Sequence, residues 1–347
     1  PDVFCNKYVK FGVFLNKALE MGADFIATGH YAIACQGASL TYELHESVDK
    51  EKDQSYYGYR EGVVHTTSLA KCLRGVIHEM LGAKKDSEIE VRKLGVFKAG
   101  NLFEEFIIEA LGNRVVHRQR EYEYKYKSIT LVGRSDYTIN DDGVLRVGEN
   151  KSVHSDSFWM REREGTLIAW HNQIQLMTYL WLERILEPYK CKTCGKVKLS
   201  TLEGNPPSCE SGHSQMILAP EEKLVNPHGI FSYISKDDCT VIGAPIQFSQ
   251  RLVDEIILPA LDIINEGYVS KNPQAAPLPP LVIFSEAKHQ YQKNWLGMYC
   301  EYHNLCAGGG WLLEATNFVT DKNKQLKAAM KNPYAEKKPK IKIVSSS

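Results

Sequence analysis

The chain has 347 residues, and its 42 lysine and arginine residues balance its 42 aspartate and glutamate residues, so the formal net charge is zero. This length suggests two domains or one large domain with insertions. A composition of 43% hydrophobic and 24% charged residues argues against a disordered or fibrous protein. No apolar run reaches the roughly 18 residues of a membrane span, and no stretch is typical of a secretion signal, so we expect a cytoplasmic protein with no membrane partner.

Hydrophobic periodicity and turn residues predict an alternating series of helices and strands. A helix over residues 10–21 and a buried strand over 24–28 come first, and a polar stretch over 36–58 marks the first boundary. The expected elements that follow are helices over 67–80 and 101–111, strands over 121–127, 129–136 and 144–151, a helix over 166–186, a cysteine-bearing insertion over 190–215, a strand over 229–235, a helix over 249–265 and a lysine-rich tail.

Two carboxylates and a lysine stand on the strands predicted over 129–136 and 144–151, which we expect to form one hairpin around the turn at 140–143. Asp136 closes the first strand, and Glu149 and Lys151 leave the same face of the second. Such carboxylates form a hard-oxygen site suited to Mg²⁺ or Mn²⁺. With the ammonium, they are the groups that phosphodiester hydrolysis needs. The alternative is an ordinary solvated hairpin.

The order of these motifs resembles a known enzyme family. Asp136 followed by Glu149-Asn150-Lys151 looks like the core of PD-(D/E)XK nucleases. His171, Gln175 and Tyr179 follow on one stripe of a predicted helix. This stripe is similar to that of the RecB-like and CRISPR-adaptation exonuclease branch, and the resemblance covers about residues 60–310.

The resemblance implies a role for each of these residues. Asp136, Glu149 and the backbone carbonyl of Asn150 would bind Mg²⁺ or Mn²⁺. Gly100-Asn-Leu-Phe-Glu104-Glu105 resembles the family's first helix, so Glu104 is expected to be a further ligand, with Glu105 as the fallback. The other implied roles are the orientation of the attacking water by Lys151, the positioning of the strand by Gln175 and Tyr179, and DNA contact by Arg134 and His171.

The fold implied is α/β, a restriction-endonuclease-like mixed sheet flanked by helices. The activity implied is that of a Mg²⁺- or Mn²⁺-dependent deoxyribonuclease, an exonuclease acting in recombination, repair or the processing of mobile-element or CRISPR-type DNA. Its implied partners are DNA and a helicase, recombination or CRISPR protein. One alternative is a non-catalytic DNA-binding module of a helicase–nuclease assembly, which would bind DNA with a steep salt dependence and cleave none.

Four residues in the insertion have the spacing of a zinc site. Cys191 and Cys194 form a C-x2-C turn followed by glycine, and Cys209 and His213 complete the set. The sequence therefore predicts structural zinc in a small zinc-ribbon-like insertion. The alternative is a loop with incidental thiols, or another metal.

Three further cysteines resemble the cluster-binding residues of the same nuclease branch, in which one cysteine before the core joins three after it to hold an iron–sulfur cluster. Cys72, Cys300 and Cys306 fit three of those positions. The remaining position falls on Gly297, which cannot ligate, although His303 is close enough in sequence to substitute. The sequence leaves open whether a cluster is present or the thiols only pack.

The first part of the chain resembles a different family. The segment from Cys5, the stretch GADFIATGHYA over 22–32 and the stretch KDQSY over 52–56 occur in the order found in tRNA 2-thiouridylases, and Cys5 falls on that family's first catalytic cysteine. The glycine-rich ATP loop of that family is absent, so there is no phosphate cradle to activate tRNA.

We therefore expect an N-terminal appendage over 1–57, a nuclease domain over 58–310 with the zinc insertion over 190–215, and a basic tail over 311–347. tRNA is not expected as a partner. Thiolation of tRNA by the first segment is nevertheless the alternative function.

Overall fold

The structure is a computed structural model that describes residues 34–35, 43–44, 60–86, 91–154, 158, 169–201, 206–209, 211–285, 289–298, 300–307 and 311–331. The chain divides into two units, Pro1–Gly58 and Tyr59–Ser347. In the first unit, β1 (Ala34–Cys35) pairs antiparallel with β2 (Glu43–Leu44). The helix predicted over 10–21, the strand predicted over 24–28 and Cys5 lie outside the described residues.

A six-stranded mixed sheet forms one side of the second unit, in the order β11-β9-β10-β5-β6-β3. β5 and β6 pair antiparallel, and β10 and β3 run parallel to β5 and β6 respectively. The cysteine-bearing segment supplies β9, β10 and β11, so it extends the main sheet. The strands are β3 (Val63–His65), β5 (Glu121–Tyr126), β6 (Ile129–Arg134), β9 (Glu187–Cys191), β10 (Val197–Ser200) and β11 (Met216–Leu218).

A five-stranded sheet forms the other side, in the order β13-β12-β8-β7-β4. β8 pairs parallel with β12 and antiparallel with β7. Asp142 and Gly143 join β7 to β8 with φ angles of 50° and 86°, the combination that a type I′ hairpin turn requires. The strands are β4 (Val115–Arg118), β7 (Tyr137–Asp141), β8 (Val144–Val153), β12 (His228–Ser235) and β13 (Val241–Ile246).

The hairpin that carries Glu149 differs from the predicted one. The strand expected over 129–136 ends at Arg134, and the chain passes at Ser135 and Asp136 into β7, which is the strand that pairs with β8. The two sheets meet at this crossing, where Gln119 N donates to Asp136 O at 3.0 Å and Ser135 N donates to Arg120 O at 3.0 Å. Asp136 therefore lies at the junction of the sheets and not at the end of a strand paired with β8.

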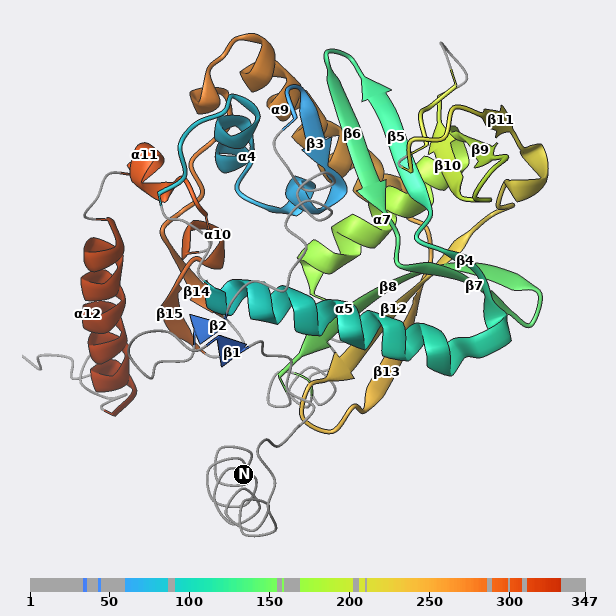
Figure 1. Cartoon of the computed structure of the whole chain (residues 1–347). Coiled ribbons are helices and arrows are strands. Elements are labelled where there is room, and N and C mark those ends of the chain that lie inside the picture. The colour runs from blue at the N-terminus through green and yellow to red at the C-terminus, as the bar shows by residue number, and fades with distance from the viewer. Residues whose placement is uncertain are drawn as a thin grey trace, which may run out of the picture. The chain divides into compact units, whose positions relative to one another are not determined.

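Helices cover both faces of the five-stranded sheet (Figure 1). α7 (Trp170–Ile185) packs against strands of both sheets and supplies much of the main core. α5 (Val91–Leu111) places Ile107 and Ile108 against Tyr137 on β7, in a separate apolar cluster. Gly100 lies inside α5, so the prediction that a helix begins after this glycine is wrong. Gly148 on β8 has to be glycine, because an added Cβ would lie 2.0 Å from the ring of Tyr137.

A buried ion pair joins α7 to the crossing between the sheets. Arg120 Nε donates to Glu183 Oε1 at 2.8 Å, and both side chains have 0% exposure. Tyr122 OH donates to the same carboxylate oxygen at 2.8 Å. Arg120 Nη2 donates to the backbone oxygen of Glu222 at 3.1 Å, and the Glu222 carboxylate in turn accepts from Lys190 on β9 at 2.6 Å. This network connects the core to the cysteine-bearing strands.

The remaining helices and two short strands complete the second unit. The helix predicted over 249–265 is present, but it widens into a π-helical turn before Pro259, whose missing N–H cannot continue the α-helical ladder. These elements are η2 (Thr66–Ala70), α4 (Leu73–Met80), η3 (Gly112–Arg114), η4 (Pro220–Glu222), α8 (Gln250–Leu252), η5 (Val253–Ile257), α9 (Leu258–Val269), η6 (Pro273–Ala275), β14 (Val282–Ser285), β15 (Gln290–Lys293), α10 (Trp295–Met298), α11 (His303–Ala307) and α12 (Trp311–Lys331).

The expected mixed α/β architecture, with several sheets flanked by helices, is confirmed. None of the helices in the described ranges combines the length and apolar character needed to cross a membrane.

Candidate functional site

Three acidic side chains and one lysine gather where the two sheets meet. We call Glu104, Asp136, Glu149 and Lys151 the carboxylate–lysine site. Asp136 lies in the link between β6 and β7, and Glu149 and Lys151 extend from β8 toward α7. Val147 lies on the same face of β8 and belongs to the main core, so the site opens beside packed apolar side chains.

Hydrogen bonds hold the carboxylates of Asp136 and Glu149 in place. Asn150 N donates to Asp136 Oδ2 at 2.7 Å, and Gln175 Nε2 donates to Glu149 Oε1 at 2.7 Å. Lys151 Nζ forms an ion pair with the same Glu149 oxygen. Gln175 also donates to Tyr179 OH at 3.0 Å, and this hydroxyl donates to the backbone oxygen of Arg134 at 2.9 Å. Gln175 and Tyr179, two of the three residues in the predicted stripe of α7, therefore face the site.

The structure distinguishes the adjacent glutamates Glu104 and Glu105 of α5. Glu104 is directed toward the site and accepts from Gln119 Nε2 at 3.2 Å, and its charge acts on that of Asp136. Glu105 points away and pairs with Arg118 at 3.4 Å on an exposed surface. Glu104 is thus the glutamate that can join Asp136. No sequence pattern had indicated Gln119, whose positive φ of 51° turns the chain at the sheet crossing.

The electrostatics of the site favour a cation. Burial, and after it the neighbouring Glu149 carboxylate, raises the pKa of Asp136 to about 7. Burial and the charge of Asp136 raise the pKa of Glu104 to about 7, and burial also raises the pKa of Glu149. Glu149 Oε2 is buried and has no hydrogen-bond partner among the described residues. An oxygen-seeking divalent ion would satisfy this atom and relieve the repulsion between the carboxylates.

Two of the other residues assigned to this site, Arg134 and Asn150, lie beside its carboxylates. Arg134 ends β6, and its positive charge acts on both Asp136 and Glu104. The backbone N–H of Asn150 contacts Asp136, so Asn150 lies beside this carboxylate. His171 lies one helical turn before Gln175, and its ring packs 5.0 Å from that of Trp295.

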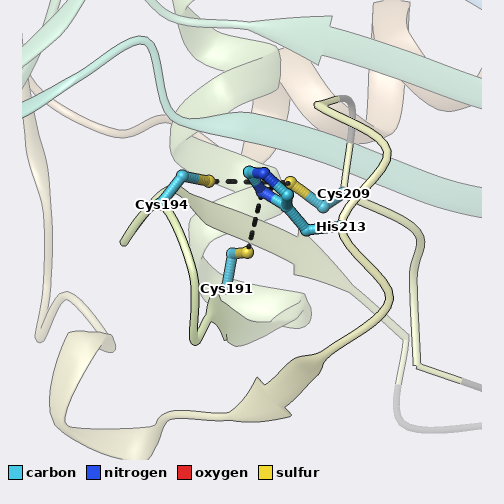
Figure 2. Close-up of side chains that lie close together, drawn as sticks. All are labelled: Cys191, Cys194, Cys209 and His213. Atoms are coloured by element: carbon cyan, nitrogen blue, oxygen red, sulfur yellow. Dashed lines mark hydrogen bonds between the residues drawn. The ribbon is translucent and has the colours of Figure 1, made fainter.

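The predicted zinc residues lie together at the outer end of the six-stranded sheet. The ligand atoms of Cys191, Cys194, Cys209 and His213, the Cys191 set, all lie within 4.8 Å of one another. His213 Nδ1 is 3.6 Å from the sulfurs of both Cys191 and Cys209, and the sulfurs of Cys194 and Cys209 are 3.7 Å apart. Figure 2 shows the three sulfurs and the imidazole directed toward one point.

Two tight turns create this arrangement. Gly195 follows Cys194 with a φ of 73°, and Gly212 precedes His213 with a φ of 74°, a conformation that glycine adopts without strain. The backbone N–H of Cys194 points at the Cys191 sulfur, and this hydrogen bond is the main reason why the pKa of Cys191 falls to about 6. A thiolate prepared in this way is the form that binds zinc.

The three remaining candidate cysteines line one pocket. Cys72, Cys300 and Cys306 share its wall with Gly297 and His303, and the other lining residues are Leu278, Pro279 and Leu281. A hydrogen bond from the Cys300 thiol, the largest influence, lowers the pKa of Cys72 to about 6. The residues that the cluster resemblance singled out are thus brought together, with the glycine among them.

The first part of the chain is similar to known proteins. Residues 1–73 match the family model for the tRNA methyl transferase HUP domain. The tRNA-specific 2-thiouridylase MnmA of Legionella pneumophila is 56% identical over 57 residues, which are 16% of this chain and 16% of that protein. The same enzyme of Blochmanniella floridana is 47% identical over 74 residues, 21% of this chain and 19% of that protein. The predicted resemblance of the N-terminal region to tRNA 2-thiouridylases is confirmed.

The match spans less than a fifth of the length of these relatives. The crystal structure of SSO0001 superposes with a TM-score of 0.40 and 18% identity, over 74% of this chain and 92% of that chain. This likeness is too low to assign a fold or a function.

These findings correct the predicted function. The chain was expected to be a Mg²⁺- or Mn²⁺-dependent deoxyribonuclease with DNA and a helicase or CRISPR protein as partners, and tRNA was not expected. The matched family and relatives are tRNA-modifying proteins, so the nuclease prediction is wrong, as are the nuclease assignment of the enzyme and its DNA partner. The alternative, a tRNA-modifying protein, agrees better with the matches. The sequence prediction rested on the order of the motifs around Asp136, Glu149 and Lys151 and gave less weight to the N-terminal similarity. A carboxylate–lysine site does not by itself determine a substrate.

Proposed function

We propose that this protein acts on tRNA and that a divalent metal ion at the carboxylate–lysine site takes part in the reaction. The match of residues 1–73 to tRNA-modifying proteins supports the choice of tRNA. The observation that carries the metal ion is the buried Glu149 Oε2, which lacks a partner among the described residues and lies beside two carboxylates with raised pKa values.

The proposed ligands are Glu104, Asp136, Glu149 and the backbone carbonyl of Asn150. Their oxygen donors suit Mg²⁺ or Mn²⁺. The ion would supply a Lewis acid that polarises an oxygen of the tRNA or lowers the pKa of a bound water. Cys5 would remain the nucleophile position of the thiouridylase-like segment, outside the described residues.

Each protein group around the ion has a proposed task. Lys151 holds the oxygen atom that reacts, and its pairing with Glu149 fixes its position. Gln175 and Tyr179 are positioning residues, since Gln175 orients Glu149 and Tyr179 fixes the end of β6. Arg134 and His171 contact the phosphate backbone of tRNA, a role that the charge of Arg134 beside the carboxylates supports.

Two further metal sites belong to this proposal. The Cys191 set holds structural Zn²⁺, a role that its compact thiolate–imidazole geometry supports. Cys72, Cys300 and Cys306 form a three-thiolate site that suits a thiophilic metal group such as an iron–sulfur cluster, since they line one largely apolar pocket. For the fold, we propose a restriction-endonuclease-like arrangement of the second unit. For the location, we propose the cytoplasm. This fold class leaves the reaction open.

The test uses the full chain with unmodified tRNA transcripts in Mg²⁺ or Mn²⁺. Binding is measured by mobility shift, and any covalent change is measured by mass spectrometry of the tRNA and of its nucleosides. Asp136→Asn with Glu149→Gln should retain tRNA binding and abolish the metal-dependent change. The matched control is Glu105→Gln, an acidic residue of α5 next to Glu104 that lies outside the site.

End-labelled single- and double-stranded DNA are assayed in parallel. Cleavage of DNA without any change to tRNA would contradict the proposal, as would the absence of tRNA binding. Unchanged activity of the double variant would place the reaction elsewhere in the chain.

A further inference from the structure

Two tryptophans from distant parts of the chain meet at the start of α7. Trp170 is the first residue of α7, and Trp295 is the first residue of α10. Their ring centroids are 6.1 Å apart, and the ring planes are inclined by 56°. The ring of His171 packs 5.0 Å from that of Trp295 and 6.2 Å from that of Trp170. Tertiary packing therefore builds an aromatic surface from segments that are far apart in the sequence.

The outer ring of this surface is presented to solvent. Trp170 has 48% exposure, and Trp295 behind it is half-buried. Trp181 on the same helix has 7% exposure and belongs to the main core. Neither Trp170 nor Trp295 is among the described side chains that form the hydrophobic cores. The exposed indole is therefore available to a ligand, since an exposed large apolar side chain gains from being covered.

Tyr233 fixes the start of α7 beside the carboxylate–lysine site. This tyrosine lies on β12, where it is the register partner of Lys151 on β8. Its hydroxyl accepts from Ala169 N at 3.1 Å and from Asn172 Nδ2 at 2.9 Å. The residue directly before Trp170 is thus held by the neighbour of Lys151, so the exposed indole lies toward the Lys151 side of the site.

The separation between the exposed indole and the carboxylates suits a nucleotide. Gln175, which donates to Glu149, lies on the same helix as Trp170, and the two are about 7.5 Å apart along its axis at about 1.5 Å per residue. Successive stacked nucleotides are about 3.4 Å apart along a strand. A base on Trp170 would therefore place the sugar–phosphate backbone within one or two nucleotides of the carboxylate–lysine site.

The charges around the exposed indole suit a nucleic-acid backbone. The side chain of Lys151 is 35% exposed, and the first turn of α7 contains no acidic residue. Proteins bind unpaired bases by combining aromatic rings, on which bases stack, with positive charge that follows the phosphates. The bases of an RNA double helix are already stacked and paired, so the surface would accept only an unpaired base.

We propose that Trp170, supported by Trp295, is a stacking platform for an unpaired base of the tRNA that reacts at the carboxylate–lysine site. This inference rests on the proposed function, because the choice of tRNA comes from there. It adds which part of the tRNA enters the site, namely a loop or a single-stranded end.

The experiment compares binding of the full chain to several RNA probes by fluorescence anisotropy in Mg²⁺. The probes are a short single-stranded RNA, the same RNA paired with its complement, and the same RNA with abasic sites in place of its bases. An unmodified tRNA transcript is measured in parallel. A single strand that contains 5-iodouridine is crosslinked with ultraviolet light, and mass spectrometry identifies the crosslinked peptide.

Trp170→Ala should weaken binding of the single strand about tenfold, a typical effect of removing one aromatic ring from a stacked base. Trp170→Tyr should restore most of the affinity, because tyrosine also presents a ring. The salt dependence of binding should be the same in both variants, since the phosphate contacts remain. Trp295→Ala should weaken binding less than Trp170→Ala does. The matched control is Phe318→Ala, an aromatic side chain of α12 with 46% exposure, which should bind as the unmodified chain does.

The paired and abasic probes should bind the unmodified chain more weakly than the single strand does, and the crosslink should map to the peptide of Trp170 or Trp295. Equal affinity of Trp170→Ala and the unmodified chain for the single strand would overturn the inference. So would equal binding of the abasic probe, or a crosslink elsewhere in the chain. Binding of tRNA without any binding of the single strand would also overturn it and would assign the exposed indole to a protein partner.

The measurements on tRNA separate this inference from the proposed function. If the unmodified chain and Trp170→Ala bind tRNA equally well, only the stacking platform is wrong. If the unmodified chain binds no tRNA, the proposed function is wrong and this inference is wrong with it. If Trp170→Ala fails to fold, the crosslink of the unmodified chain and the affinity of Trp170→Tyr decide the matter.

Discussion

The carboxylate–lysine site and the Cys191 set differ in where their ligands lie. The carboxylates are buried at the junction of the two sheets, and burial raises the pKa of each of them. The thiols lie on two turns at the outer end of one sheet, where a backbone N–H lowers the pKa of Cys191. The core holds the carboxylate–lysine site rigidly, and its carboxylates repel one another when no ion is bound. In the Cys191 set the thiolate of Cys191 is stabilised, but the set has few apolar contacts of its own.

Zinc removal therefore has the largest expected effect, and it should be confined to one region. Cys191→Ser, or a strong chelator, should unfold the segment over 187–218, because zinc binding to small sites is worth about 10–16 kcal/mol and the local cluster is small. Hydrogen exchange measured by mass spectrometry should show lost protection in β9–β11 and retained protection in β7 and β8.

Cys239→Ser is the matched control, since Cys239 is an exposed free cysteine outside the set. Unchanged protection of β9–β11 after zinc removal would show that the sheet, and not the metal, maintains the segment.

The buried pair of Arg120 and Glu183 tests whether the two regions are independent. Glu183→Gln leaves the guanidinium without its charged partner, which typically costs about 3–5 kcal/mol in a buried site. We expect a loss of this order in the free energy of unfolding measured with urea, together with weaker zinc binding, because Arg120 also contacts Glu222, which pairs with Lys190 beside Cys191.

The control is Glu255→Gln, which removes an exposed i,i+4 pair with Arg251 and should change the stability by less than about 0.5 kcal/mol. Equal stability losses for the two variants would contradict the cost assigned to the buried pair, and unchanged zinc binding in Glu183→Gln would contradict the coupling between the core and the zinc region.

Local patterns predicted the parts of the two sites that depend on spacing. The two-residue spacing of Glu149 and Lys151 placed both on one face of a strand, and the helical spacing of Gln175 and Tyr179 placed both on one stripe. The C-x2-C turn predicted the zinc residues for the same reason. Their roles in binding or catalysis remain predictions.

Features that depend on distant contacts could not be predicted. The chain changes sheets at Asp136, and only the pairing of β7 with β8 reveals it. The local sequence did not indicate that Gly100 lies inside a helix, because the 21-residue helix α5 continues through this glycine. The reaction was predicted wrongly because buried carboxylates beside a lysine suit several metal-dependent reactions.

The pH dependence of stability should distinguish the carboxylate–lysine site from the Cys191 set. The pKa of Asp136 rises from 3.8 to about 7 on folding, so the folded state takes up a proton that the unfolded state has already lost. Stability from this group is present in full below pH 4 and is lost as the pH rises toward 7. We expect the metal-free protein to lose on the order of 2 kcal/mol between pH 5 and 8, about 4–8 °C in Tm.

Calorimetry at several pH values, with zinc as the only divalent ion, measures this change of stability with pH. Asp136→Asn should flatten it, and saturating Mg²⁺ should reverse it, because the ion binds the deprotonated carboxylates. A slope of the same size in Asp136→Asn would assign the titration to other groups.

The smallest predicted effect separates the adjacent glutamates Glu104 and Glu105 of α5. Glu104→Gln removes one charged ligand from a site that also contains Asp136 and Glu149, so Mn²⁺ affinity measured by calorimetry should fall about tenfold, or about 1.4 kcal/mol. The fold should be kept, since glutamine can still bond to Gln119. Glu105→Gln removes only an exposed pair with Arg118 and should leave the affinity unchanged. Equal losses for both variants would mean that α5 acts through long-range charge. A loss only in Glu105→Gln would mean that the helix turns by one residue when the ion binds.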